Sequence, residues 1–363
     1  MTQPVSYFDE WGYSIVGDPI EPIKNESGLI IEFGAETDWD ITFETLKAQK
    51  KKKSLNGFLR DMPRKIEHMF RNEGGINNDF DIDNLNNHVD YLNQLTDYDL
   101  KETIFRGNLV WVGEPFKSDV IWRPNDKGKI FTTWIPDTEI QNQSYKGMFH
   151  GKEMVMPSNN HIGCFGVDSY DISKTVDGIG SNGAIVGYSK FSMSGCPSHS
   201  FFLKYVERPD KRDDFYDDVI KICKFFGMYA LIESNKPRLL EYMADNGFRG
   251  YSMTRPDKKW KDLSDFEKDF GGIPSSKEGN NDQANLLKDY IFDFIGQNVE
   301  NDCKVYFKDM ILEWIKFNVK KRTKFDLSVA GQLAMLGSQY KVKQRRSIAI
   351  NSSEGLRFSD FSA

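Results

Sequence analysis

Hydrophobic and polar positions follow a regular pattern in the second half of the chain, from about residue 159 onward. Three strand-length apolar runs come first, and later runs alternate with stretches of helical spacing. The pattern predicts strands at 161–168, 183–190, 200–207, 228–233 and 250–254, and helices at 213–226, 237–246, 281–296, 305–317 and 326–340. Short connections favour an antiparallel meander, whereas a strand reached through a helix runs parallel to a neighbour. The expected fold class is therefore α/β, with a mixed five-stranded sheet flanked by helices.

The first 150 residues have a less regular pattern. Helical spacing occurs at 39–50 and 55–70, and residues 107–136 indicate two or three strands around a turn. We expect residues 1–150 to form an irregular α+β connector with helices and a small β-hairpin. We expect 151–345 to form the α/β domain and 346–363 a C-terminal tail. The acidic, asparagine-rich stretch 77–93 is predicted to be either an exposed interaction surface or a solvated helix.

Composition supports folding but not general binding to polyanions. The chain has 363 residues, 39% of them hydrophobic, and a formal net charge of -6 with a pI near 5.6. Because non-specific nucleic-acid affinity depends on Lys and Arg displacing counterions from phosphates, basic residues must act locally if they act at all. Each local cluster is either a solvated face or a phosphate-binding surface. The clusters are 50–53, which is expected to be a solvated face or loose tail, then Lys320, Lys321, Arg322 and Lys324, and finally Lys341, Lys343, Arg345 and Arg346.

The four cysteines, Cys164, Cys196, Cys223 and Cys303, lie far apart in the sequence. They form neither a C-x-x-C pair typical of zinc sites nor the dense framework of a secreted domain. The Cys196-Pro-Ser-His199 spacing is expected to be a turn. No apolar run reaches the ~18 residues of a membrane span, and the N-terminus is acidic where a signal peptide is basic. These features predict reduced, buried thiols in an intracellular protein that does not interact with membranes.

Three acidic residues occupy positions where apolar packing does not explain a charge. Asp168 ends the apolar run of the first predicted strand, and Glu233 ends that of the fourth. Asp326 begins a late helix that is otherwise apolar and must pack against the sheet. Taken singly, an acid at a strand end is commonly a turn former and one at a helix start is commonly an N-cap. In the ribonuclease H strand order, however, the first and fourth strands are neighbours, so all three carboxylates would meet at one sheet edge.

Carboxylates this close together repel one another unless a cation lies between them. Hard oxygen ligands favour Mg²⁺ or Mn²⁺ over zinc. Two such ions about 4 Å apart can activate a water and stabilise the leaving 3′ oxygen of a phosphodiester. We therefore expect two ions, with Asp168 bridging both and with Glu233 and Asp326 each holding one side. Asp171 is a candidate fourth ligand at the rim of the site.

The same motifs resemble the large subunit of tailed-phage terminases, the DNA-packaging motor, and specifically its C-terminal nuclease half of the ribonuclease H-like superfamily. The resemblance runs along most of the chain. Upstream, residues 55–63, 69–71, 106–111 and 122–128 resemble the stretch that links motor to nuclease in such proteins. The central motifs are Gly166-Val-Asp168, Gly183-Ala-Ile-Val, Leu231-Ile-Glu233-Ser-Asn, Gly272-Ile-Pro-Ser and Phe325-Asp326-Leu-Ser-Val-Ala330.

The resemblance implies that residues 151–345 are a nuclease domain whose catalytic, metal-binding acids are Asp168, Glu233 and Asp326. It implies an endonuclease that cuts concatemeric double-stranded phage DNA during genome packaging in the host cytoplasm. DNA would approach over the two basic clusters. The other implied partners are the terminase ATPase half or chain, the small terminase subunit and the portal. The sequence has no G-x-x-x-x-G-K-[ST] loop, so ATPase activity is not expected of this chain itself.

Two other functions fit the same residues. A transposase or junction resolvase of the same superfamily would use the same three acids, and strand transfer or a preference for branched DNA would identify it. A non-catalytic module that docks a packaging motor onto a portal or small subunit would keep the acids for structural reasons. Failure to bind any divalent metal would favour that module.

Overall fold

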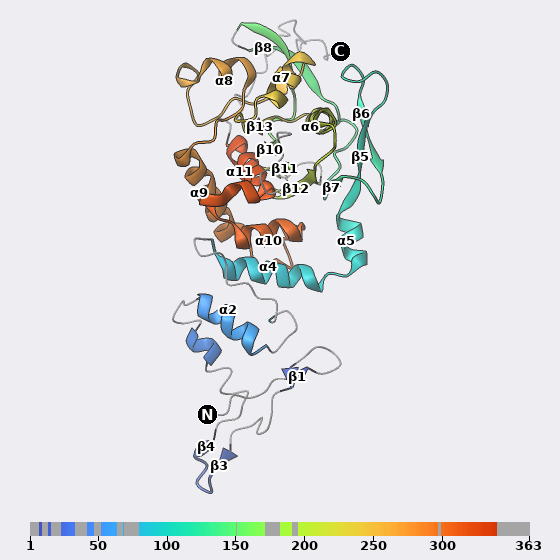
Figure 1. Ribbon diagram of the computed structural model, residues 1–363. Helices are drawn as coiled ribbons and strands as arrows, with labels where there is room; N and C mark the ends of the chain where they lie inside the picture. The colour runs from blue at the N-terminus through green and yellow to red at the C-terminus, as the bar shows by residue number, and fades with distance from the viewer. Residues whose placement is uncertain are drawn as a thin grey trace, which may run out of the picture.

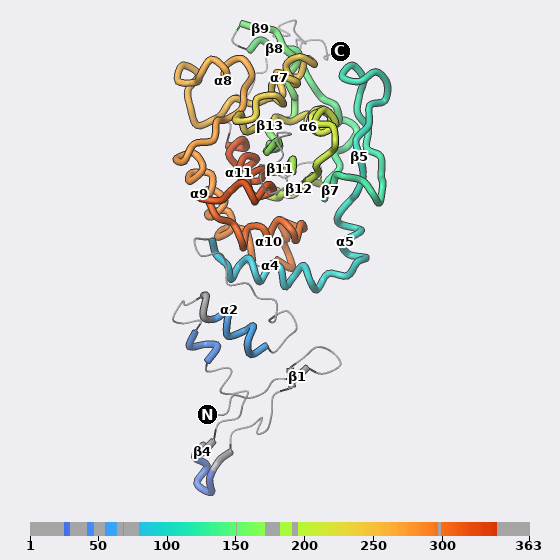
Figure 2. Tube along the Cα trace, in the orientation of Figure 1, coloured from blue at the N-terminus to red at the C-terminus, as the bar shows by residue number. Residues whose placement is uncertain are grey.

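The computed structural model describes residues 80–149, 151–170, 182–190, 195–296 and 299–339, together with the short segments 7–8, 14–15, 23–32, 42–46, 52–63 and 68 (Figure 1, Figure 2). Within these residues, no helix combines the length and the apolarity that crossing a membrane requires. Several predicted features lie outside them: the candidate ligand Asp171, most of the helix expected at 39–50, and the basic cluster Lys341, Lys343, Arg345 and Arg346.

A mixed seven-stranded sheet forms the centre of this α/β structure, in the order β13-β10-β11-β12-β7-β5-β6. Strands β10, β11 and β12 form the antiparallel meander that the sequence predicts, and β13 pairs parallel to β10. The strands are β5 (Phe105–Trp111), β6 (Val120–Pro124), β7 (Ile130–Thr132), β10 (Gly163–Asp168), β11 (Gly183–Ser189), β12 (Phe201–Glu207) and β13 (Ala230–Ile232).

The expectation of a five-stranded sheet is wrong because the sheet continues past β12. Strand β7 pairs antiparallel to β12, with Leu203 opposite Thr132, and β5 and β6 follow. Most of β12 is buried, so an open edge there would leave backbone N–H and C=O groups unpaired in an apolar setting. Three strands from before residue 150 therefore share one sheet with the strands that follow it.

The fifth strand that the sequence predicts is replaced by a 3-10 turn, η1 (Arg249–Tyr251). Isolated parallel bridges follow the turn, one of them between Ala230 and Ser252. Gly250 accounts for the difference, because a Cβ added there would lie 2.0 Å from the Val155 carbonyl oxygen. Glycine therefore lets the backbone of this turn pass close to that of Val155, where a residue with a side chain would not fit.

Helices cover both faces of the sheet (Figure 1). The elements outside the sheet are α2 (Lys52–Asp61), α4 (Ile82–Gln94), α5 (Asp97–Thr103), α6 (Arg212–Phe226), α7 (Arg238–Asp245), α8 (Asp265–Phe270), α9 (Lys277–Phe294), α10 (Lys308–Lys316), α11 (Asp326–Ser338), η2 (Trp260–Asp262), η3 (Val319–Lys324), β1 (Tyr7–Phe8), β2 (Ser14–Ile15), β3 (Ile23–Lys24), β4 (Ile30–Glu32), β8 (Ser144–Phe149) and β9 (Lys152–Pro157).

The two faces of β11 face different helices. Ile185 packs with α6 and α7 in one core, whereas its neighbours Ala184 and Val186 pack with α10 and α11 in another, as strand alternation requires.

Helix α11 lies directly on β10, and small residues make this close approach possible (Figure 1). A Cβ added to Gly166 would lie 1.9 Å from the Ala330 carbonyl oxygen, and one added to Gly337 would lie 2.4 Å from the sulfur of Cys164. The end of α11 therefore lies over the start of β10, so helix and strand run in opposite directions. This orientation brings the first residue of α11 toward the last residue of β10.

Helix α4 lies in the asparagine-rich stretch for which either a solvated helix or an exposed surface is predicted, and it is neither. Its apolar face packs against α10, where Leu85 is fully buried. His88 is buried in the same region, and its Nε2 lies 2.7 Å from the Val305 carbonyl oxygen. Burial lowers the pKa of His88 to about 4, although the contact with Val305 acts in the opposite direction. Helix α4 therefore contributes one face to the core.

The prediction of reduced, buried thiols is confirmed, since all four cysteines are free and buried. Burial raises the pKa of Cys196 and of Cys303 to about 12, which disfavours the reactive thiolate. The Cys196-Pro-Ser-His199 segment forms the expected turn. Within it, Nδ1 of His199 lies 3.0 Å from the Tyr188 hydroxyl.

Candidate functional site

Asp168 and Glu233 end two neighbouring parallel strands. Strands β10 and β13 pair with Val167 opposite Ile232, and the backbone nitrogen of Glu233 donates to the Val167 carbonyl oxygen at 3.2 Å. The next register position places Asp168 beside Glu233. Adjacent strands lie about 4.8 Å apart, so the two carboxylates share one edge of the sheet. The sequence-based pairing of these two acids therefore agrees with the observed register.

Asp326 reaches the same edge from the helix side. It is the first helical residue of α11, while the N-cap position belongs to Phe325, so side-chain capping does not explain it. The Asp326 Oδ2 atom accepts a hydrogen bond from the backbone nitrogen of Asn182 at 3.0 Å. Asn182 immediately precedes β11, which is the neighbour of β10. The structure thus brings together the three acids that the sequence singles out.

Asp168 is the most deeply buried of the three acids, with 5% of its surface exposed. Burial raises the pKa of Asp168 to about 7; Lys236 opposes this shift, and the negative charges of Glu233 and Asp326 add to it. Among the described residues, its buried Oδ1 atom has no hydrogen-bond partner. A carboxylate in this setting is unfavourable as an anion unless a cation approaches it.

Two basic side chains supply positive charge at the site. The Nζ atom of Lys236 lies 3.6 Å from Asp168 Oδ1, and an Nη atom of Arg322 lies 3.7 Å from Glu233 Oε1. Lys236 also donates to the carbonyl oxygen of Ser169. Each of the two strand-end acids therefore has its own cation in this structure.

The basic cluster predicted to bind DNA divides into two kinds of residue. Arg322 is buried and turned toward Glu233. Lys320, Lys321 and Lys324 are exposed on η3, directly before α11. Only these three lysines of the cluster are in a position to meet a large ligand from solution.

Sequence reasoning missed Glu313 on α10. Its Oε2 atom accepts hydrogen bonds from the backbone nitrogen of Ser328 at 2.6 Å and from the Ser328 hydroxyl at 2.8 Å. It thereby satisfies an N–H group at the start of α11, which has no intrahelical partner. Burial raises the pKa of Glu313 to about 7, Ser328 opposes the shift, and Asp326 adds to it. An acid within the apolar run Met310–Ile315 was the available signal.

The carboxylate oxygens of this cluster are the type of ligand that a hard divalent cation prefers. Three carboxylates converge, and the orphaned Oδ1 atom of Asp168 provides an acceptor without a donor. In this arrangement, no three His, Cys, Asp or Glu side chains of the described residues form a ready-made metal-binding group. The basic side chains of Lys236 and Arg322 instead lie next to the carboxylates.

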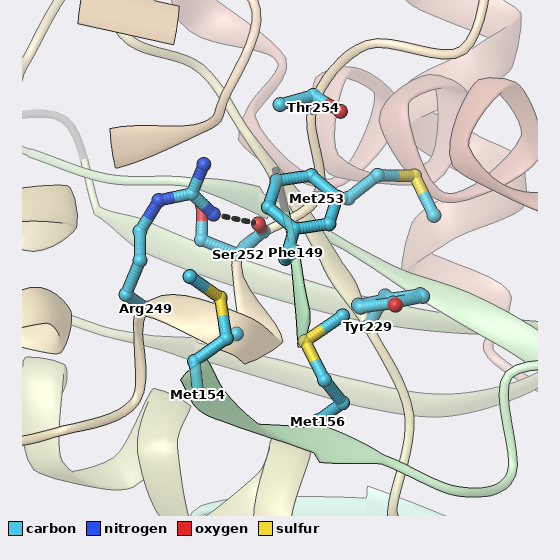
Figure 3. Close-up of a pocket in the computed structure, with 9 residues that line it drawn as sticks. Phe149, Met154, Met156, Tyr229, Arg249, Ser252, Met253 and Thr254 are labelled. Atoms are coloured by element: carbon cyan, nitrogen blue, oxygen red, sulfur yellow. Dashed lines mark hydrogen bonds between the residues drawn. The ribbon is translucent and has the colours of Figure 1, made fainter. Parts of the chain in front are cut away.

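The hollow shown in Figure 3 is lined by none of these acids and offers different chemistry. Its walls include Met154, Met156 and Phe149, with Arg249 as the charged residue. Arg249 donates to the Ser252 carbonyl at 2.7 Å and also to the carbonyls of Lys268 and Asp269, so its guanidinium is committed to the fold. An adjoining hollow of about 470 Å³ shares Phe149, Met154 and Arg249. The adjoining hollow also has Lys152, Glu153, Lys268 and Asp269 in its walls, and Lys152 and Asp269 are paired with each other at 3.1 Å.

The three-acid cluster is therefore the candidate functional site, and its identification depends on geometry and chemistry alone. No protein-family model and no curated protein matches the chain.

Proposed function

We propose that this chain is a metal-dependent endonuclease of the ribonuclease H-like superfamily that cuts double-stranded DNA. The observation that carries the proposal is the convergence of Asp168, Glu233 and Asp326 from two adjacent parallel strand ends and a helix start. Such a cluster destabilises the fold when no cation is bound. The reason is that Asp168 is buried and one of its oxygens has no hydrogen bond among the described residues. Energetically unfavourable charges gathered at one point of a sheet edge are typical of a functional site.

The sheet order supports the superfamily assignment. Strands β13, β10, β11 and β12 lie side by side in that order, with β10 to β12 antiparallel and β13 parallel to β10. These are the relationships expected of the fourth, first, second and third strands of a ribonuclease H-like sheet. The parallel bridge from Ala230 to Ser252 lies where the fifth strand of that order would run. Strands β5 to β7 would then be an addition to the sheet.

Asp168, Glu233 and Asp326 would hold Mg²⁺ or Mn²⁺, as a pair of ions in the working enzyme. Bound there, such ions supply Lewis-acid activation of water and stabilisation of the leaving 3′ oxygen. The remaining work falls to the chain. Arg322 orients the Glu233 carboxylate, the Asn182 N–H group orients that of Asp326, and burial of Asp168 keeps bulk water from its inner oxygen.

The biological role that we propose is cleavage of concatemeric phage DNA at the start and end of genome packaging, in the host cytoplasm. It rests on the motif resemblance to the nuclease half of large terminases. The ATPase half or chain, the small terminase subunit and the portal are the partners that this role requires. A chain without a phosphate-binding loop would supply cleavage, and its partners would supply translocation.

Plasmid cleavage by the purified chain tests the proposal. Supercoiled DNA is expected to be nicked and then linearised in Mg²⁺ or Mn²⁺, and to stay intact in chelator, because the carboxylates alone cannot stabilise the leaving oxygen. The reaction is followed over time on agarose gels. Metal-independent cutting would contradict the proposed chemistry, and a strong preference for branched DNA would instead identify a junction resolvase.

The exposed lysines of η3 are expected to contact DNA phosphates. Charge reversal of Lys320, Lys321 and Lys324 to Glu should weaken DNA binding and lower the slope of log K against log salt by about three, since each lysine that leaves a phosphate removes roughly one. Fluorescence anisotropy in Ca²⁺ or chelator measures binding without cleavage. A matched control reverses Lys258, Lys259 and Lys261, which are equally exposed in another part of the described chain. An identical salt slope for both triple variants would exclude η3 from the interface.

A non-catalytic docking module is the second candidate, and one observation favours it. Asp168 and Glu233 each already have a basic partner, Lys236 and Arg322, so a purely structural role would leave neither charge uncompensated. Calorimetry separates the two candidates. A structural module should show no heat of Mn²⁺ binding, whereas the nuclease should bind Mn²⁺ at the acid cluster.

A further inference from the structure

Lys236 and Arg322 give the acid cluster its own positive charges, and the two residues are anchored differently. We propose that Lys236 is a displaceable counter-ion, which neutralises Asp168 until a divalent cation takes its place, whereas Arg322 stays with Glu233 throughout. The inference rests on the proposed metal-dependent function and adds to it a competition that controls metal binding.

Arg322 is held on several sides. Its side chain is 10% exposed and lies 3.7 Å from Glu233. It also donates to Asn280 and, at 3.3 Å, to Gln283, both on α9. A planar guanidinium with several donors committed in fixed directions cannot leave without breaking these bonds together. Arg322 is therefore a positioning residue for Glu233.

Lys236 is held less firmly. Its Nζ atom is 3.6 Å from Asp168 Oδ1, beyond hydrogen-bond distance, and its side chain is 28% exposed. Within the described part of the chain, its one hydrogen bond goes to the carbonyl oxygen of Ser169. The four-carbon stem of a lysine rotates freely, so the ammonium can move into water. If the ammonium moved away, no hydrogen-bond donor among the described residues would take its place at Asp168 Oδ1. A divalent cation would therefore be stabilised most strongly at that oxygen.

The charges at the site favour exchange over addition. Three carboxylates and two basic side chains leave one net negative charge, and withdrawal of Lys236 leaves two, which one divalent cation balances. If Lys236 stayed, its ammonium and the metal would repel each other at close range in a poorly solvated site. The neighbouring Glu313 is not one of these three carboxylates; it accepts hydrogen bonds from the Ser328 N–H group and hydroxyl at the start of α11.

Mn²⁺ binding to the full chain without DNA tests this competition. Isothermal titration calorimetry at pH 8 compares the unaltered protein with Lys236→Met and Lys236→Arg. Lys236→Met is expected to bind Mn²⁺ about tenfold more tightly or better, because the competing charge is gone. Lys236→Arg keeps the charge and is expected to bind no more tightly than the unaltered protein. The rise in Tm on addition of Mn²⁺ should follow the same order.

A matched control removes the same charge elsewhere. Lys221 on α6 also bridges aspartates, Asp217 and Asp218, and is largely buried, so Lys221→Met should leave Mn²⁺ affinity unchanged. Equal affinity of Lys236→Met and the unaltered protein would overturn the inference and leave the proposed function intact. If neither Lys236→Met nor the unaltered protein bound Mn²⁺, both the inference and the proposed function would be wrong. Lys236→Gln, which can still donate to Ser169, provides a second variant with the same expectation as Lys236→Met.

Discussion

Changing Asp168 to Asn is expected to reduce plasmid cleavage by about 10³-fold or more, because a direct metal ligand should matter more than the outer-shell residues whose loss costs about 10–100-fold. Asparagine keeps the size and one oxygen of the side chain but cannot supply the negative charge that binds a divalent cation. Asp168 lies at the centre of the cluster, beside Glu233 and within electrostatic reach of Asp326. The loss should therefore appear in both Mg²⁺ and Mn²⁺.

The same substitution is expected to stabilise the metal-free protein at pH 8. Burial raises the pKa of Asp168 from 3.8 to about 7, with Lys236 opposing the shift. The folded state therefore binds this proton more tightly than the unfolded state, so stability falls as the pH rises from about 4 through 7. Asparagine does not ionise, and at pH 8 the variant should gain on the order of 2–4 kcal/mol in the free energy of unfolding.

Both effects are measured on the same protein, by plasmid cleavage and by urea unfolding in chelator at pH 5 and pH 8. Asp309→Asn is the control, because Asp309 carries an exposed carboxylate on α10, paired with Lys204 away from the cluster. It should keep its cleavage activity and change stability by less than about 1 kcal/mol. Retained cleavage by Asp168→Asn would contradict the assignment of Asp168 as a catalytic metal ligand. Equal stability at pH 8 would show that Asp168 does not carry a buried charge.

Gly166→Val is expected to destabilise the fold by about 3 kcal/mol or more, at the upper end of what overpacking costs. The added Cβ would meet the Ala330 carbonyl oxygen at 1.9 Å and the Ala334 nitrogen at 2.3 Å. Both are backbone atoms of α11, so no side-chain rotation can relieve the contact. The helix would have to move off β10, which would carry Asp326 away from Asp168.

Denaturant unfolding and cleavage together check this prediction. Gly113→Ala is the matched control, since its new Cβ would meet only the side chain of Ser118, at 3.5 Å. That control should stay within about 1 kcal/mol of the unaltered protein. A stable Gly166→Val variant with full activity would mean that the close contact between α11 and β10 does not position the acids.

Local patterning was sufficient to locate the elements that carry the acids. The strand predicted at 183–190 is observed as β11, and the helix predicted at 326–340 begins where α11 begins. Strands covered on both faces consist almost entirely of buried residues, so their apolar runs stand out in the sequence. A charge at the end of such a run is equally conspicuous, which is why Asp168 and Glu233 could be chosen.

Contacts between distant segments could not be found in this way. The pairing of β7 with β12 joins residues about 70 positions apart, and nothing in either run specifies its partner. The bend at Gly250 depends on the Val155 backbone, which belongs to another element. The ion pair of Arg322 with Glu233 likewise depends on where η3 passes the end of β13.

The sequence by itself determined the α/β class, the buried thiols, and the positions of Asp168, Glu233 and Asp326 at the ends of apolar elements, because burial and alternation are recorded in neighbouring residues. Only the tertiary structure decided that the sheet has seven strands and that Lys236 and Arg322 lie beside the acids. Those features arise from packing between segments far apart in the chain, where direction and distance depend on the whole fold.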